Sequence, residues 1–402
     1  MRIYSASSEE ALRARKLLKD WASEGLVTEA QHNRMEQDTV CDLRTTNIFL
    51  RLVLFLFTLI IVCATAGLFY AGILSRPSEQ TTGVFLLIFA GISYAVAEAA
   101  VSQAKLYRYG IEEALAVCSV GFLCGGMLMA FSNGSILAAK QRTIEPWVLT
   151  GGAISSLWIW RRFGLWYAFF AAMVFVVFLP EYWTSSHSAR HLMVAGFYAA
   201  GVAVIAAIRS QHRFDYLDDD YSIAEALLWL GMYLAINLQL SSLSLLPRWL
   251  GGHGGGAGEF ARSFYWTTWV LTWCIPPIGL VRGIRQKDRF VIAAGGIIAV
   301  LTLVTNKPYL GWERHTWDPM LLGVLLTGVA LFVRRWLAGG KDGIRYGFTA
   351  VRLSSKDKRW MSVGSTALGL LSPSVLPSPQ TSSNDVRFGG GDSGGAGASG
   401  DF

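Results

Sequence analysis

Charged residues are scarce in this sequence. They make up only 16% of the 402 residues, whereas an ordinary soluble domain has about 25%. Apolar residues make up 52%. A soluble fold of this length has to turn part of every element toward water, so it cannot bury so much apolar surface. The composition excludes an ordinary soluble globular protein and predicts an integral membrane protein whose main partner is the lipid bilayer.

Cysteine is also scarce, and the sequence has no Cys-x-x-Cys pair. Four of the five cysteines lie inside apolar runs, and no spacing indicates a paired framework. We therefore predict no disulfide scaffold, no structural metal site and no cofactor. The cysteines are Cys41, Cys63, Cys118, Cys124 and Cys274.

The net charge of +7 does not indicate a nucleic-acid partner. The lysines and arginines lie between apolar runs and at the two ends of the chain, which is the distribution of membrane topology signals. No cleavable signal peptide is evident, because the first apolar run starts near Ile48, behind a long charged segment. We interpret that run as a signal anchor.

Ten apolar runs predict an all-α fold, a polytopic transmembrane helical bundle of about ten spans. A helix needs about 20 residues to cross the hydrocarbon layer. The fourth run is short, and Arg161-Arg162 separates it from the fifth, so we predict two short spans joined by a tight basic turn. The predicted spans are 48–74, 83–103, 111–131, 146–160, 165–183, 189–208, 222–246, 264–284, 289–305 and 318–337.

An even number of spans places both termini on the same side of the membrane. The loops on the two sides carry nearly equal numbers of lysines and arginines, so they barely decide the orientation. Seven lysines and arginines precede the first span and several more close or follow the last, and such residues favour the cytoplasmic side. We predict a multi-pass protein of the cell membrane with cytoplasmic termini.

Residues 1–47 predict a cytoplasmic helical hairpin. The first helix ends at Gly25, and Thr28 opens the second, with Gln31 completing a capping box. The transmembrane domain covers 48–337.

Two polar segments follow that domain. Residues 338–371 form a cytoplasmic basic segment. Residues 372–402 are rich in Ser, Pro and Gly and cannot offset their chain entropy by burying apolar area, so we predict a disordered tail.

The transmembrane domain contains a candidate internal repeat, 83–183 and 189–305. The two copies each span four helices, an even number, so they have the same orientation, as in a parallel repeat. Chance similarity between apolar segments is the alternative. The matching segments are GIEEAL at 110–115 with SIAEAL at 222–227, and WVLT at 147–150 with WVLT at 269–272.

Three glutamates form a candidate intramembrane polar site. Glu113 and Glu225 occupy matching positions in the two copies, each near the start of a span. They either bind a cation or relay protons between the copies, or they face headgroups and assist helix initiation. Glu98 lies deeper in its span, and the nearest candidate partners are Lys105 and Arg108.

For other polar residues, a structural role competes with a functional one. We expect Asn237 and Gln239 to hydrogen-bond between helices. His187 and His191 have a spacing that suits a metal, but no third ligand is evident. We interpret residues 218–220 as an acidic helix cap, and residues 251–258 lack the context of a phosphate-binding loop. No pairing of a nucleophile with a base supports an enzyme.

The hairpin sequence EGLVTEAQ at 24–31 resembles the start of bacterial membrane proteins of the domain-of-unknown-function 2157 family, in which a Gly-Leu-Ile-Thr hairpin precedes many spans. The segment GIEEAL at 110–115 is similar to an element of the same group. The resemblance covers roughly the first 130 residues and implies a bacterial inner-membrane protein without an assigned substrate or catalytic residue. The second copy has Ala224 in place of the first glutamate.

Two functional hypotheses follow from the sequence. The first is transport or permeation of an ion or small solute through two parallel four-span units. The second is a non-transporting scaffold or sensor whose hairpin and tail bind partner proteins. Closed packing around Glu98, Glu113 and Glu225 would favour the second hypothesis.

Overall fold

A computed structural model describes most of the chain. It describes residues 3–23, 25, 27–39, 42–73, 78–131, 141–211, 218–241, 260–313, 315–340, 344–346 and 348–349. The chain divides into two compact units, Met1–Thr327 and Gly328–Phe402. The predicted glycine-rich loop at 251–258 and the predicted tail at 372–402 lie outside the described residues.

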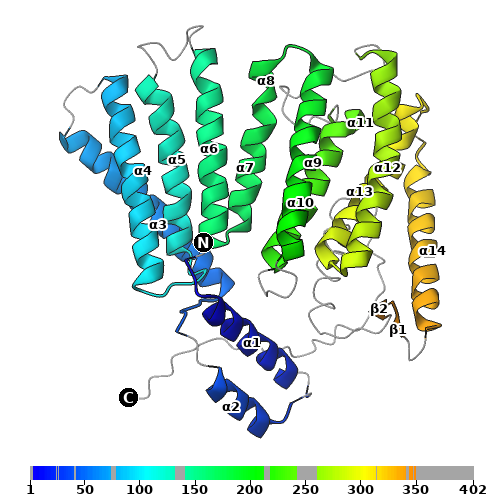
Figure 1. Cartoon of the computed structure of the whole chain (residues 1–402), viewed down its shortest axis with the longest axis horizontal. Coiled ribbons are helices and arrows are strands. Elements are labelled where there is room, and N and C mark those ends of the chain that lie inside the picture. The colour runs from blue at the N-terminus through cyan, green and yellow to red at the C-terminus, as the bar shows by residue number, and fades with distance from the viewer. Residues whose placement is uncertain are drawn as a thin grey trace, which may run out of the picture. The chain divides into compact units, whose positions relative to one another are not determined.

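The first unit is built from helices that stand side by side (Figure 1). In chain order, its described helices are α1 (Ala6–Ser23), α2 (Glu29–Asp38), α3 (Ile48–Ile73), α4 (Glu79–Ser102), α5 (Ile111–Phe131), α6 (Gln141–Phe163), α7 (Trp166–Phe178), α8 (Pro180–Trp183), α9 (His187–Gln211), α10 (Asp218–Ile236), α11 (Leu238–Ser241), α12 (Arg262–Gln286) and α13 (Arg289–Tyr309). Helix α14 (Asp318–Ala338) runs from the first unit into the second, where β1 (Ile344–Arg345) pairs antiparallel with β2 (Phe348–Thr349).

The all-α helical bundle predicted from the sequence is confirmed. Each predicted span coincides at least in part with a helix, but the predicted span 222–246 is broken between α10 and α11, and its last residues lie outside the described chain. Seven helical segments of the described chain are long and apolar enough to cross a membrane, which makes this a multi-pass membrane protein. The apolar part of α10 is shorter, Tyr221–Ile236, and α6 and α12 do not belong to the seven. The count of ten spans therefore stays a prediction.

Helix α3 shows why the bundle needs lipid around it. Of its 26 residues only Ala66 is buried. Ile48, Phe49 and Leu68 expose 84%, 73% and 74% of their surface. A soluble monomer rarely shows so large a continuous apolar face, whereas hydrocarbon chains cover it without cost.

Local sequence signals set the helix ends as predicted. Thr28 caps α2, and its backbone N–H donates to the Gln31 side chain at 3.0 Å, which confirms the capping box. Gly25 has a left-handed φ of +72° after α1. The predicted break beside Arg161 is also present: α6 ends at Phe163, Gly164 has a φ of +69°, and α7 begins two residues later.

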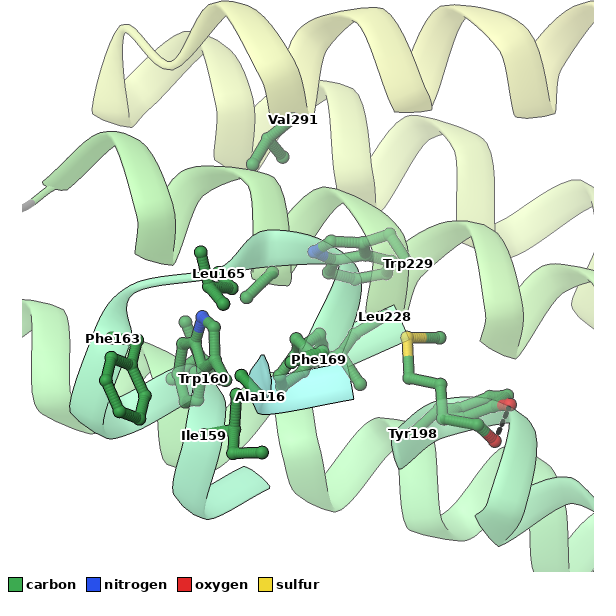
Figure 2. Close-up of a cluster of buried hydrophobic side chains, with 14 of the residues drawn as sticks. Ala116, Ile159, Trp160, Phe163, Leu165, Phe169, Tyr198, Leu228, Trp229 and Val291 are labelled. Atoms are coloured by element: carbon green, nitrogen blue, oxygen red, sulfur yellow. Dashed lines mark hydrogen bonds between the residues drawn. The ribbon is translucent and has the colours of Figure 1, made fainter. Parts of the chain in front are cut away.

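A buried apolar cluster joins the middle helices of the first unit (Figure 2). Trp160 of α6 packs against Phe169 of α7, with ring centroids 4.8 Å apart and ring planes tilted by 55°, and it also packs edge-on against Tyr221 of α10. Tyr198 of α9 donates its hydroxyl hydrogen to the Met173 carbonyl of α7 at 3.1 Å. The tyrosine hydroxyl is therefore satisfied inside an otherwise apolar contact.

The closest helix contact lies between α4 and α5. A Cβ added at Gly83 would lie 2.1 Å from the backbone nitrogen of Ala130. Only a residue without a side chain allows this approach, and close backbone packing is a principal source of helix association in lipid. Gly83 therefore acts as a contact point between the two helices.

Replacing Gly83 with alanine should force α4 away from α5 and destabilise the protein by about 1–3 kcal/mol, the usual cost of overpacking. Thermal unfolding of the full chain in detergent measures this. Gly91→Ala is the matched control on the same helix, because a Cβ added at Gly91 would meet no atom within 4 Å. The control should be neutral or up to about 1 kcal/mol more stable. Equal unfolding temperatures for both variants would contradict the close contact.

Candidate functional site

Glu113 lies in the first turn of α5 and is tied to α3. Its side chain is 5% exposed and forms an ion pair with Arg51, whose Nε donates to Oε2 at 3.0 Å. A second donor, Nη2, bonds the other carboxylate oxygen. The chain reaches this position through Gly110, at φ +104°, where a Cβ would lie 2.3 Å from the Arg51 carbonyl oxygen. The glycine lets α3 approach closely enough for the two-point pair.

Glu225 is the centre of a larger buried cluster. It has no exposed surface and lies between Arg209 of α9 and Arg282 of α12. Arg209 Nη1 lies 2.7 Å from Glu225 Oε2 and 2.8 Å from Asp288 Oδ2. Gln286 Oε1 accepts a further bond from the same nitrogen at 3.2 Å. Among the described residues, two guanidinium groups face two carboxylates in this cluster.

Asp288 gives that cluster a second anchor. Its Oδ1 accepts the backbone N–H groups of Phe290 at 2.9 Å and Val291 at 3.3 Å, which caps the N-terminus of α13. Its other oxygen binds Arg209. One carboxylate therefore satisfies the start of a helix and holds a buried cation. Four helices, α9, α10, α12 and α13, meet at this point.

Glu98 pairs with Arg162 at the end of α6, rather than with Lys105 or Arg108 of the following loop. Lys105 and Arg108 have left-handed φ values of +56° and +50°, so the chain turns sharply just after α4. Nearby, Trp158 Nε1 donates to the Tyr94 hydroxyl at 2.8 Å. The Glu98 side chain is 31% exposed. It links α4 to α6.

The three predicted glutamates are not brought together into one site. Each is held by an arginine from another helix, and Glu113 and Glu225 are buried rather than facing headgroups. Glu225 is also not in the first turn, because α10 begins at Asp218. Within the described part of the chain, an open groove lies on α12 and none of the glutamates lines it. The groove residues are Pro277, Ile278, Val281, Arg282, Arg285 and Gln286.

The N-terminal segment is docked on the end of the bundle where α5 begins and α6 ends. The Ile3 backbone N–H donates to the Arg162 carbonyl at 3.0 Å. Tyr4 is 6% exposed, and its ring packs edge-on against Tyr107 at 4.8 Å. Burial raises the pKa of the Tyr4 hydroxyl, and the negative charge of Glu112 raises it further. This phenol therefore stays neutral at physiological pH.

A second polar cluster surrounds a break between α10 and α11. Asn237 Nδ2 donates to Thr305 Oγ1 of α13 at 2.9 Å, and Gln239 Nε2 donates to the Tyr265 hydroxyl of α12 at 3.1 Å. These bonds confirm the interhelical role predicted for both residues. The Leu238 N–H, which the break frees from the helix, donates to the Tyr309 hydroxyl at 2.7 Å. Side chains thus satisfy the interrupted backbone.

The two histidines lie in different surroundings. His187 is exposed, whereas His191 is buried and its Nδ1 lies 2.6 Å from the Ala235 carbonyl oxygen. No group of three potential ligands suited to a metal occurs among the described residues. Residues 218–220 form the start of α10, and their interpretation as an acidic cap stays a prediction because their side chains lie outside the described residues.

The sequence did not reveal which arginines pair with the three glutamates. Arg162, Arg209 and Arg282 read as topology signals at the ends of spans, yet each one binds a predicted glutamate. Arg51 was visible as a lone charge in the most apolar run, and such a charge usually has a partner inside the bundle. Asp288 gave a weaker signal as a polar residue just before an apolar run.

No family model, curated protein or solved structure matches this chain. The geometry of the described residues therefore carries the functional argument.

The Arg51–Glu113 pair should show strong coupling. Arg51→Met leaves a buried carboxylate without its cation, which should cost about 3–5 kcal/mol of unfolding free energy. Adding Glu113→Leu removes that uncompensated charge and should recover most of the loss. Unfolding of the full chain in detergent measures the double-mutant cycle. Arg161→Met, at an exposed arginine at the end of α6, should change stability by less than about 0.5 kcal/mol. Additive losses in the double variant would show that the pair is not coupled.

Proposed function

We propose that this protein is a non-transporting scaffold or sensor of the cell membrane, with both termini in the cytoplasm. The observation that carries the proposal is that Glu98, Glu113 and Glu225 each form an ion pair with an arginine of another helix. A carboxylate that carries an ion or proton has to exchange partners, whereas a carboxylate held by arginines on neighbouring helices fixes those helices. The closed packing around Glu113 and Glu225, together with the ion pair that holds the partly exposed Glu98, supports the second of the two hypotheses drawn from the sequence.

The N-terminal hairpin is the proposed partner-binding element. Helix α1 packs Leu12 against the buried apolar cluster, and Leu18 of the same helix is only 5% exposed. Leu17 and Trp21 are 46% and 42% exposed, and their four-residue spacing places them on one face. Ile3 and Tyr4 fasten the start of the hairpin to the bundle. A partner bound to α1 is therefore held against the ends of the spans.

Substitution of the exposed face should test partner binding without undocking the hairpin. Leu17→Ser combined with Trp21→Ser should remove the crosslinked partners that wild-type protein retains in membranes of the native cells. Deletion of residues 1–47 is a poorer test, because it also removes the buried Tyr4 contact. Gln37→Ala, at an exposed polar residue of α2, is the control and should leave the partner set unchanged. An identical partner set for the double variant would count against the hairpin.

Transport is tested separately in proteoliposomes. Because the three carboxylates are paired, we expect no protein-dependent flux of protons, Na⁺ or K⁺ from the wild type. Glu113→Gln and Glu225→Gln should likewise show the leak of empty vesicles. A flux in the wild type that either glutamine variant abolishes would overturn the proposal in favour of transport.

A further inference from the structure

The groove on α12 is lined almost entirely by apolar surface and ends beside the guanidinium groups of two arginines. It has a volume of about 600 Å³ and is lined by Pro277, Ile278, Val281, Arg282, Arg285 and Gln286. Ile278 and Val281 are 55% and 48% exposed. The apolar residues come first along the helix, and the arginines lie in its last two turns. Hydrocarbon-facing residues are thus followed by cations at the helix end, where the headgroup region of a bilayer would begin.

The basic end is continuous with the buried cluster around Glu225. Arg282 donates from Nε to Glu225, and Gln286 accepts from Arg209 at 3.2 Å. These contacts hold two groove side chains in place from the protein side. A guanidinium has five N–H donors. In Arg282, the described hydrogen bond to Glu225 uses the N–H group of Nε. The Arg282 side chain is 28% exposed.

Among the described side chains at this end, cations outnumber anions. Arg209 and Arg282 pair with Glu225 and Asp288. Arg285 lies outside that cluster, is exposed, and lines the groove. The exposed residues Lys287 and Arg289 follow in the turn to α13. The described surface beside the groove is therefore cationic, which makes an anionic occupant favourable.

We propose that the groove binds an anionic phospholipid, with its phosphate at Arg282 and Arg285 and an acyl chain along Pro277, Ile278 and Val281. Two features select this occupant over a neutral lipid or a soluble anion. The arginines match phosphate geometry, and the apolar floor lies on a helix of a membrane-embedded bundle. Basic pockets at the ends of membrane helices bind such headgroups. The inference goes beyond the scaffold proposal and does not depend on it.

Native mass spectrometry of the delipidated full chain in detergent tests the site. We expect phosphatidylglycerol to bind more tightly than phosphatidylcholine. Arg285→Gln should weaken phosphatidylglycerol about fivefold, the effect of one arginine near an anionic headgroup. Arg161→Gln is the matched control, since this exposed arginine ends α6 and lies outside the groove. It should leave the affinity unchanged.

The apolar half is tested by blocking it. Val281→Trp should fill the groove and reduce retention of phosphatidylglycerol at least as strongly as the arginine variant. Ile284→Trp is the control, because Ile284 is 49% exposed on the same helix but does not line the groove. All variants should keep the wild-type unfolding temperature, because each replaced side chain is exposed.

Glycerol phosphate, which has the headgroup charge without acyl chains, distinguishes a lipid site from a phosphate site. It should not displace phosphatidylglycerol at equal concentration. The proposal is overturned by equal binding of the two lipids, by displacement with glycerol phosphate, or by binding that neither Arg285→Gln nor Val281→Trp weakens.

Discussion

Ion pairs between helices are the constraint on which the arrangement of this bundle depends. Lipid chains are as apolar as leucine, so the hydrophobic effect does little to hold one membrane helix against another. A carboxylate near the hydrocarbon layer, by contrast, has to find a cation inside the protein. Glu113 joins α5 to α3, Glu98 joins α4 to α6, and Glu225 joins α10 to α9 and α12. Each pair fixes the axial position of a helix relative to a neighbour.

The two ends of α10 use different chemistry. The ion pairs of the three glutamates gather at the end of the bundle where α5, α10 and α13 begin, and the N-terminal segment docks at this end through Tyr4. The opposite end of α10 relies on neutral hydrogen bonds, centred on Asn237 and the hydroxyl of Tyr309. Broken helices often mark binding sites in transporters. Here the donors freed by the break are used by neighbouring side chains, so the break serves the packing of α10, α12 and α13.

The sequence predicted the helices well and their partners poorly. Apolar runs and caps are local signals, so the ten helical regions, the hairpin at Thr28 and the turn beside Arg161 could be read from neighbouring residues. Ion pairing is a tertiary property. The choice of Lys105 or Arg108 for Glu98 assumed that proximity along the chain means proximity in space, and the actual partner is 64 residues away. The three glutamates were found because a carboxylate in an apolar run is conspicuous, whereas arginines at span ends have a second explanation as topology signals.

Arg282 belongs both to the buried cluster and to the surface groove, and this double role has a consequence for the bundle. A ligand that binds only the folded state stabilises it in proportion to its concentration and affinity. A phosphate at Arg282 and Arg285 would add an acceptor on the outer side of a guanidinium that Glu225 already holds from the inner side. The helix junction would then be completed partly by protein and partly by lipid. On that basis the headgroup composition of the membrane would influence the stability of the contact between α10 and α12.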